Sequence, residues 1–454
     1  MINLNNFFNP KSIAIIGVSR NPKKVGHVLY RNLLDGNFQG KIFIVNKNAD
    51  TILNQKSYKS ILKIKQKVDL TIISVPARFV MQTLKECNKK GVKDILIITS
   101  GFAEIGNTEL ENEMKEYLIS NRMRMIGPNC LGVLNAKDKI DTLFLPRYRL
   151  SRPEPGGISF VCQSGAVGST ILDLAADKGH KFAKFVSYGN ATTIDESDII
   201  EYLGKDPDTK VICLYVEAVK DGRKFIRVMK AVSKKKPIIV IKGGLTEEGN
   251  QATLSHTGSL AGNVDVYFGV FKQTGLIRAE SLGEMLNFAS IFEKSTKPEG
   301  KKIQVITNGG GFGILSTDAI VKNPHLQMAN LSKDTIKRLK YRFPETATVG
   351  NPMDLVGDAT TKRYRTALDA CLSEKKVNII LLIALYQTPL VTTDIVDVIS
   401  EANALHKKPI VVVSAGGEFT EVLSKSLEKN NVVTFTFPEE AVKTIGELVK
   451  YYVK

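Results

Sequence analysis

The stretch IAIIGVSRNPKKVGHVLYRNLL (residues 13–34) decides the fold, since it reads as a β-branched apolar run, a turn and a helical pattern. A strand, a turn and a helix in this order form one unit of a doubly wound α/β fold. The same alternation continues along the chain, and βαβ alternation places buried parallel strands in sheets covered by helices. The further predicted strands are residues 42–46, 70–75, 95–99, 158–162, 211–216, 238–241, 303–307, 379–383 and 410–414.

The length of 454 residues, 43% of them hydrophobic, is too great for one core and indicates about three domains. Two breaks in composition separate them, PRYRLSRPEPGG at 146–157 and KSTKPEGKK at 294–302. We therefore predict domains at residues 1–145, 146–295 and 296–454.

The second and third of these blocks repeat three sequence patterns in the same order. VCQSGAVG (161–168) matches ITNGGGFG (306–313), and YGNATTIDESD (188–198) matches VGNPMDLVGDA (349–359). KKPIIVIKGG (235–244) matches KKPIVVVSAGG (407–417). The repetition indicates two related α/β domains.

The composition restricts the class of partner and the compartment. A formal net charge of +17 favours anionic partners, but the lysines are dispersed and no nucleic-acid-binding signature accompanies them, so we expect no nucleic acid. The sequence has no uninterrupted run of 18 or more apolar residues, so we predict no membrane span. The N-terminus lacks the features of a signal peptide. The five cysteines follow no metal-binding spacing, which predicts reduced thiols, no metal site and a cytoplasmic protein.

The first strand–turn–helix unit lacks the dinucleotide-binding pattern GxGxxG. After Gly17 come Ser19 and Arg20, and the next glycine is Gly26. The second strand ends in IVNKN with Lys47, where an NAD-binding domain has an acidic residue for the ribose. A lysine at this position favours a phosphate, and coenzyme A (CoA) carries both a 3′-phosphate and a diphosphate. Later strands end in SVPAR (74–78), TSGFAE (99–104) and GPNCLG (127–132), although each alone is compatible with an ordinary turn.

Glycine-rich loops open a helix in each of the two repeated blocks. A helix N-terminus presents free N–H groups and a partial positive charge, so it binds phosphate without a lysine or arginine. The alternative is that these glycines only permit close packing of the helix on the sheet. Because the loops are equivalent, we predict two sides of one phosphate site, formed by Ser164, Gly165, Gly309, Gly310 and Gly311.

One histidine and one acid stand apart from the others of their kind. His256 lies in the small-residue stretch SHTGSLAG, whereas the other four histidines lie in ordinary amphipathic or turn contexts. Glu217 ends a predicted strand, and its alternative interpretation is a loop acid or a helix cap. We interpret four further polar residues of the repeats as turn or N-cap residues, namely Asn190, Asp195, Asn351 and Asp354.

The motifs VSRNPKKVG, VNKN, SVPA, TSGFAEIG and GPNCLG resemble the CoA-binding domain of the succinyl-CoA synthetase superfamily, nearest its ADP-forming acyl-CoA synthetase branch. The resemblance extends over nearly the whole chain. It implies a Rossmann-like CoA-binding domain followed by two related flavodoxin-like domains. The residues that it assigns to CoA are Ser19, Arg20, Lys23, Gly26, Lys47, Val75, Pro76, Ser100, Gly101 and Asn129.

The same resemblance implies the chemistry. SHTGSLAG is similar to the family's phosphohistidine loop, so His256 is expected to accept a phosphoryl group while Glu217 orients its ring. The implied reaction converts acyl-CoA, phosphate and ADP to a carboxylic acid, CoA and ATP. No Walker A or ATP-grasp segment is present, so ADP, ATP and Mg²⁺ are expected on a separate ATP-grasp β subunit, in an α₂β₂ assembly.

Two other functions remain open from the sequence. One is the α-type subunit of a succinate–CoA ligase, and the other is a non-catalytic CoA-sensing scaffold. The sequence leaves the acyl group, the direction of the reaction and the choice between ADP and GDP undetermined.

Overall fold

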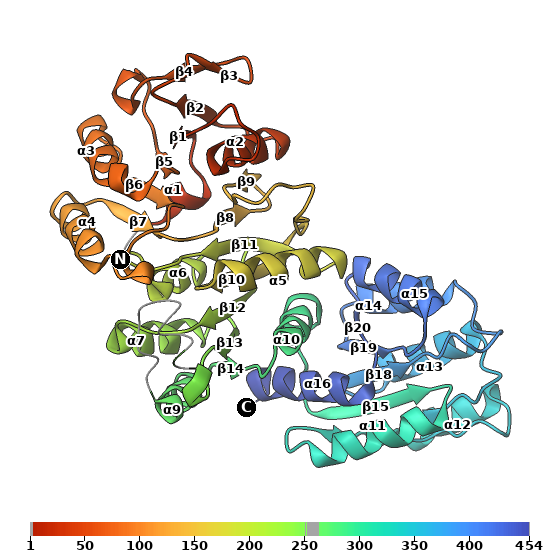
Figure 1. The fold of residues 1–454 in the computed structure, drawn as a ribbon. Coiled ribbons are helices and arrows are strands. Elements are labelled where there is room, and N and C mark those ends of the chain that lie inside the picture. Colours follow the sequence, from red (N-terminus) through yellow and green to blue (C-terminus); the bar gives the residue numbers. More distant parts are fainter. Residues whose placement is uncertain (1–2, 250, 252–262, 454) are drawn as a thin grey trace. The chain divides into compact units, whose positions relative to one another are not determined.

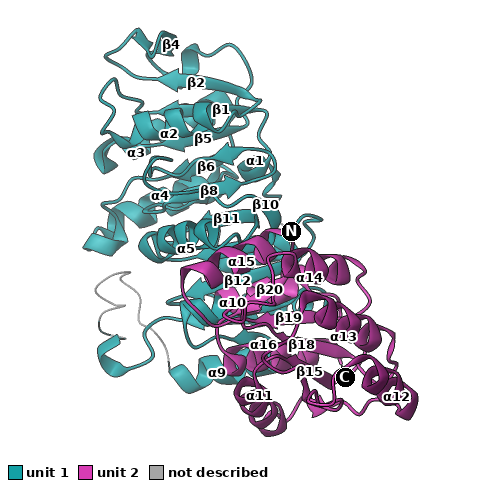
Figure 2. Ribbon diagram, turned by 90° about the vertical axis from the view of Figure 1, so that its right-hand side faces the viewer, with its two compact units in different colours: residues 1–285 teal, residues 286–454 magenta. Residues whose placement is uncertain are grey.

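A computed structural model of the chain describes residues 3–249, 251 and 263–453. The chain folds into two compact units, residues 1–285 and 286–454 (Figure 2). The described residues of unit 1 form two seven-stranded sheets, and those of unit 2 form one six-stranded sheet. Figure 1 labels most of the helices and strands of both units. No helix in the described part of the chain is both long and apolar enough to cross a bilayer.

The first sheet of unit 1 has the strand order β3-β4-β2-β1-β5-β6-β7, and all neighbours except β3 and β4 run parallel. The side chains of Ile13 and Ile15 pack with α2, while Ala14 and Ile16 belong to the core under α3 and α4. Period-two alternation along β1 therefore supplies both faces of the sheet. The elements are β1 (Ser12–Ile16), α2 (Val25–Asp35), β2 (Lys41–Val45), β3 (Thr51–Ile52), β4 (Gln55–Tyr58), β5 (Leu70–Ile73), α3 (Val80–Lys90), β6 (Asp94–Ile97), α4 (Thr108–Ser120) and β7 (Arg124–Ile126), with short 3₁₀ turns η1 (Ile61–Lys63), η2 (Ala77–Phe79) and η3 (Ala103–Ile105).

The second sheet of unit 1 has the order β14-β13-β12-β10-β11-β8-β9. It is parallel except for the hairpin β8–β9, in which β8 pairs with β11 in antiparallel orientation. The elements are β8 (Gly132–Asn135), β9 (Ile140–Asp141), β10 (Pro155–Cys162), α5 (Gly165–Asp177), β11 (Phe182–Ser187), α6 (Glu196–Leu203), β12 (Val211–Val216), α7 (Gly222–Val232), β13 (Ile238–Lys242), α9 (Val264–Thr274) and β14 (Ile277–Arg278).

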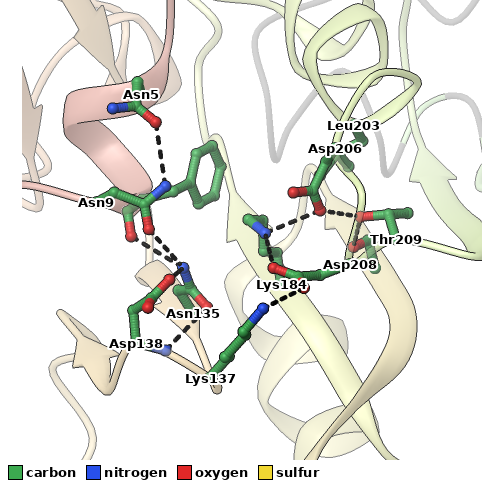
Figure 3. Close-up of polar contacts among 12 residues, drawn as sticks. Asn5, Asn9, Asn135, Lys137, Asp138, Lys184, Leu203, Asp206, Asp208 and Thr209 are labelled. Carbon is green, nitrogen blue, oxygen red and sulfur yellow. Dashed lines mark hydrogen bonds and ion pairs between the residues drawn. The ribbon is translucent and has the colours of Figure 1, made fainter.

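The N-terminal helix α1 (Asn5–Phe8) contacts both sheets of unit 1, and on the first sheet Asn6 Nδ2 donates to Asp94 Oδ2 of β6 at 2.8 Å. The Phe8 ring stacks on Tyr202 of α6 with centroids 4.8 Å apart, and the Phe8 carbonyl accepts a hydrogen bond from Asn135 Nδ2 of β8 at 3.0 Å. Beside them lies a buried ion pair, in which Lys184 Nζ of β11 is 2.8 Å from Asp206 Oδ2 (Figure 3). Asp208 connects this pair to Lys137 on the surface, with the Lys137 Nζ to Asp208 Oδ1 distance 2.7 Å.

The sheet of unit 2 is wholly parallel, with the order β16-β15-β18-β19-β20. Strand β17 pairs with the carboxyl end of β15. Helix α10 (Leu282–Lys294) contains the boundary between the units. Inside unit 2, Lys294 and Glu428 form a buried ion pair. The elements are β15 (Lys302–Thr307), α11 (Gly310–Lys322), β16 (Gln327–Met328), α12 (Lys333–Arg342), β17 (Met353–Asp354), α13 (Thr361–Ser373), β18 (Ile379–Ile383), α14 (Ile395–Ala404), β19 (Ile410–Val413), α15 (Glu418–Lys429), β20 (Val433–Phe435) and α16 (Pro438–Tyr452).

The predicted duplication reappears in the strand order. The run β14-β13-β12-β10-β11 of the second sheet corresponds to β20-β19-β18-β15-β16 of the third. The matching sequences VCQSGAVG and ITNGGGFG occupy the same place, at the end of β10 before α5 and at the end of β15 before α11. The second and third sheets therefore share one topology.

All ten predicted strands are present, which confirms the predicted α/β class with mostly parallel sheets. The exact domain limits stay predictions, because the strand pairing changes sheet earlier than residue 145, between β7 and β8. The predicted break at 146–157 is not a free linker. Arg147 and Arg152 both bind Asp141, which is 1% exposed, at 2.8 and 2.9 Å.

Candidate functional site

The carboxyl ends of β1, β5, β6 and β10 open into one cavity of about 730 Å³ in unit 1. Ligands in parallel α/β folds bind at this edge of the sheet. Eight of the residues predicted to bind CoA or phosphate line this cavity together. They are Ser19, Gly26, Val75, Pro76, Ser100, Asn129, Ser164 and Gly165.

The first turn brings α2 very close to the sheet. Gly17 has φ +103°, which strongly favours glycine, and a Cβ built on Gly26 would lie 2.2 Å from the Gly17 carbonyl oxygen. The N-terminus of α2, at Val25, consequently faces the cavity with its free N–H groups. This geometry is suited to a diphosphate, as the sequence predicts.

Replacing Gly26 with Ala is expected to destabilise the chain by about 1–3 kcal/mol, because the new methyl group meets backbone rather than a movable side chain. It should also displace the start of α2 and weaken binding of CoA at least tenfold in a calorimetric titration. Gly222 is the matched control, since it opens α7 and a Cβ there meets nothing within 4 Å. Gly222→Ala should be neutral or slightly stabilising, and an equal loss in both variants would contradict this explanation.

The other predicted CoA residues lie outside the cavity wall. The Arg20 side chain donates from Nε to the Thr51 carbonyl at 3.2 Å, and Lys23 is exposed. Lys47 Nζ lies 5.9 Å from the centroid of the exposed Phe79 ring, which also has the Arg78 guanidinium 4.9 Å away. The two cations near this ring are available to an anionic ligand that extends from the cavity.

The loop after β6 is held by hydrogen bonds from its backbone to the side chain of Glu104. Gly101 has φ +109°, and its N–H donates to Glu104 Oε1 at 2.5 Å. Burial acts to raise the pKa of Glu104, but hydrogen bonds from Asn190, Gly101 and Phe102 outweigh it and lower this pKa. Glu104 is therefore held as a carboxylate under the backbone of the loop.

Ser164 is the N-cap of α5, and its Oγ accepts the Val167 N–H at 3.4 Å. A hydroxyl that accepts one bond still has its proton to donate. Ser164 is buried, while Gly165 is partly exposed to the cavity. The helix end thus presents N–H groups and one hydroxyl to the cavity.

The two interpretations of the glycines can now be separated by position. A Cβ on Gly168 would lie 2.7 Å from the Phe185 ring, and one on Gly313 would lie 3.2 Å from Thr307 Cγ2, so both residues serve close packing. A Cβ on Gly165 would make only ordinary contact, at 3.6 Å from Leu131, and one on Gly311 would meet nothing. Packing therefore does not explain Gly165 and Gly311, and their backbone is left open to an anion.

In unit 2 the equivalent loop opens α11 with Gly309 at the N-cap and Gly310 as the first helical residue. A Cβ on Gly309 would lie 2.5 Å from Leu385 Cδ1, so this glycine packs closely. Gly310 lies near the Asp354 carboxylate, 3.1 Å from its ideal Cβ. The proposal that the loops of α5 and α11 form one phosphate site remains a prediction, because the two loops belong to different units.

Glu217 follows β12 and is 6% exposed. Its backbone N–H donates to Gln163 Oε1 at 2.8 Å, which connects it to the loop of Ser164. Burial and the charge of Glu217 both raise the pKa of Tyr215. Burial lowers the pKa of Lys242, whereas the charge of Glu217 acts in the opposite direction. An acid, a phenol and an ammonium thus meet at the ends of β12 and β13.

His256 lies outside the described residues, and its predicted role stays a prediction. Of the residues interpreted as structural, Asp195 caps α6 by accepting the Asp198 N–H at 3.0 Å, and Asp354 accepts the Val356 N–H at 2.9 Å. Asn351 accepts the Val305 N–H at 2.9 Å. Asn190 differs from these three, because it lines the cavity.

The sequence analysis did not assign three further residues of the cavity wall, Lys24, Gln163 and Asn190, to ligand binding. The repeated sequence pattern could have identified Gln163. It aligns with Asn308, and each side chain accepts a backbone N–H from the end of the next strand of its sheet, Gln163 from Glu217 and Asn308 from Leu385. Lys24 was missed because its neighbour Lys23 appears equivalent in the sequence.

Three domain families match consecutive parts of the chain. A CoA binding domain matches residues 11–136, a succinyl-CoA ligase like flavodoxin domain matches residues 155–292, and a Ligase-CoA domain matches residues 303–452.

Relatives align with nearly the full chain. The ADP-forming acetate–CoA ligase of Methanocaldococcus jannaschii is 41% identical over 97% of this chain, which spans 62% of that relative's length. The α subunit of ADP-forming acetate–CoA ligase II of Pyrococcus furiosus is 38% identical, with 98% of this chain and 97% of the relative aligned. The dinucleotide forming acetyl-coenzyme A synthetase 1 of Ca. Korarchaeum cryptofilum, solved with phosphate and ADP, gives a TM-score of 0.93 at 35% identity, covering 99% of this chain and 97% of that one.

Proposed function

Because this chain belongs to the family of ADP-forming acetate–CoA ligases, we propose that it is the CoA-binding, phosphohistidine-carrying subunit of an ADP-forming acyl-CoA synthetase. Its reaction is the reversible conversion of acyl-CoA, phosphate and ADP to a carboxylic acid, CoA and ATP. The observation that carries the proposal is the single cavity lined both by the predicted CoA residues and by the helix end at Ser164 and Gly165.

In the first step a phosphate oxygen attacks the thioester carbonyl, the C–S bond breaks, and CoA leaves as the thiol with a proton from phosphate. The N–H groups at the start of α5 and the Ser164 hydroxyl hold the phosphate for this attack. One helix end contributes roughly 0.3–1 kcal/mol when exposed and up to about 2 kcal/mol when partly buried. The loop of Gly309, Gly310 and Gly311 supplies the second helix end.

In the second step a ring nitrogen of His256 attacks the phosphorus of the acyl phosphate, and the carboxylate leaves. Glu217 accepts a hydrogen bond from the proton-bearing nitrogen of the ring, which keeps the other nitrogen's lone pair available. The hydrogen bond from the Glu217 backbone N–H to Gln163 Oε1 supports this arrangement, since it holds the acid beside the loop of Ser164.

In the third step ADP takes the phosphoryl group from phosphohistidine, and ATP forms. We place the nucleotide and Mg²⁺ on an ATP-grasp β subunit, in an α₂β₂ assembly. The coverage of 62% of a longer relative against 97% of an α subunit supports a second part, either fused or separate. Five free cysteines, all buried, support a location in the reducing cytoplasm.

The alternatives are weaker. A succinate–CoA ligase α-type subunit is not favoured, because relatives named as acetate–CoA ligases match all three blocks of the chain. A scaffold that only senses CoA has no need for the buried Glu217 or for the open backbone at Gly165 and Gly311.

Mixing the purified chain with its ATP-grasp partner should give ATP from acetyl-CoA, phosphate and ADP, measured by a luciferase assay. The chain alone should give none, because the proposal places the nucleotide site on the partner. A panel of acids, assayed for CoA and ATP consumption, then identifies the preferred acyl group. ATP formation by the chain alone would refute the placement of the nucleotide site on the partner. Absence of turnover with the partner would refute the proposed function.

A further inference from the structure

Asn190 occupies a junction between the two sheets of unit 1. It follows β11, and its side-chain Nδ2 donates to Glu104 Oε2 at 2.7 Å and to Glu111 Oε2 at 2.9 Å. Glu104 lies in η3, and Glu111, which is 6% exposed, lies in α4. One neutral amide thus satisfies two carboxylates of the CoA-binding half at once.

The same two acids hold the loop after β6. Glu104 Oε1 accepts the N–H groups of Gly101 and Phe102, at 2.5 and 3.2 Å. Glu111 Oε2 accepts the Ala103 N–H at 3.1 Å. The backbone that follows Ser100, a residue of the cavity wall, is therefore fixed through the acids to Asn190.

The backbone of Asn190 is also held in place, by contacts with Pro128 and Lys220. Its backbone N–H donates to the Pro128 carbonyl at 3.1 Å, and its carbonyl accepts Lys220 Nζ at 2.6 Å. Gly189 has φ +58°, and a Cβ there would lie 2.2 Å from the Pro128 oxygen. The remaining oxygen, Asn190 Oδ1, lies 3.4 Å from Asn129 Nδ2.

We propose that Asn190 is a positioning residue for the thioester end of CoA, acting through Asn129 and through the loop at Ser100 and Gly101. This inference rests on the proposed function. The cavity wall includes Ser100, Asn129 and Asn190 on one side and Ser164 on the other, so a shift of the first group changes the distance between thioester and phosphate. Asparagine suits the position because its amide donates two bonds to the acids and keeps an oxygen for Asn129.

The test replaces Asn190 with Asp in the chain assembled with its ATP-grasp partner. The new carboxylate faces Glu104 and Glu111 without a donor. Repulsion should displace these two acids and weaken their hydrogen bonds to the backbone of residues 101–103. We expect the KM for acetyl-CoA to rise at least tenfold, while the KM for ADP changes less than twofold. Adding Glu104→Gln should recover part of this rise, because the introduced amide can accept from the Gly101 N–H and donate to the introduced carboxylate.

Asn88→Asp is the matched control. The Asn88 amide also donates two bonds, to Tyr117 Oη at 3.2 Å and Asn121 Oδ1 at 2.7 Å, and accepts one from Lys93, but it does not line the cavity. Its KM for acetyl-CoA should stay within twofold of the wild type. If Asn190→Asp does not fold, Asn190→Ser removes both amide donors without adding charge and must show the same selective rise.

An unchanged KM for acetyl-CoA in a folded Asn190 variant, or equal rises in the KM values of acetyl-CoA and ADP, would overturn the inference while leaving the proposed function intact. Absence of turnover in the wild-type complex would instead refute the proposed function.

Discussion

Replacing His256 with Asn is expected to abolish labelling of the chain by radioactive phosphate in the presence of acetyl-CoA. The asparagine amide has no lone pair able to attack phosphorus, so no phosphoenzyme forms. Wild-type label should be stable in alkali and lost in acid, as a phosphoramidate is. The measurement is autoradiography of the denatured chain after treatment at each pH, and ATP formation with the partner should fall below detection.

His406→Asn is the control, because His406 has φ +50° and asparagine readily adopts this conformation. That variant should label as the wild type does. Glu217→Gln gives a second arm, with labelling slowed by about 10²-fold or more but not abolished, since the ring is retained and only its orientation is lost. Full labelling of the His256 variant would show that the phosphoryl acceptor lies elsewhere.

Replacing Lys184 with Met is expected to lower the free energy of unfolding by about 3–5 kcal/mol. Lys184 is 1% exposed in the middle of β11, and its loss leaves Asp206, with a side chain only 6% exposed, as a buried carboxylate without its cation (Figure 3). Asp206 still accepts the Thr209 hydroxyl, which replaces only a small part of the lost interaction. The measurement is the urea midpoint and slope of the purified chain.

Lys137→Met provides the comparison at the same cluster. Its ion pair with Asp208 is 2.7 Å long, but the Lys137 side chain is 62% exposed, so its loss should shift the urea midpoint far less than the loss of Lys184. If the two variants lost the same stability, the buried pair would not be the element that holds this edge of the sheet.

The fold was predictable where strands are buried on both faces. β12 (Val211–Val216) and β18 (Ile379–Ile383) were predicted to the residue, because uninterrupted apolar runs mark such strands. β11 (Phe182–Ser187) was not predicted, since Lys184 interrupts its apolar pattern and the acids that pair with it, Asp206 and Asp208, follow more than twenty residues later. A charge that a distant residue neutralises gives no local signal.

In the candidate site, too, residues with a local sequence signal were predicted and residues that depend on distant partners were not. Glycine loops before helices are local, so Ser164 and Gly165 were found from the sequence and line the cavity. Asn190 was interpreted as a turn residue because its partners Glu104 and Glu111 lie 86 and 79 residues away. Arg20, which the family resemblance assigns to CoA, lies outside the cavity wall with its Nε donating to the Thr51 carbonyl of β3, so its CoA contact stays a prediction. Side-chain direction, unlike loop position, depends on what the rest of the fold supplies.

The hairpin β8–β9 has a consequence for how such a chain can be rearranged in evolution. Its residues follow the first sheet in sequence but complete the second one in space, and α1 returns from the start of the chain to pack beside them. A gene fusion or exchange with a breakpoint near residue 145 would separate these edge strands from the sheet that they finish, and would expose the backbone of β11 to pairing with other molecules. A breakpoint between β9 and β10 is therefore expected to be disfavoured, whereas the described strands of residues 286–454 form a sheet that takes no strand from residues 1–285.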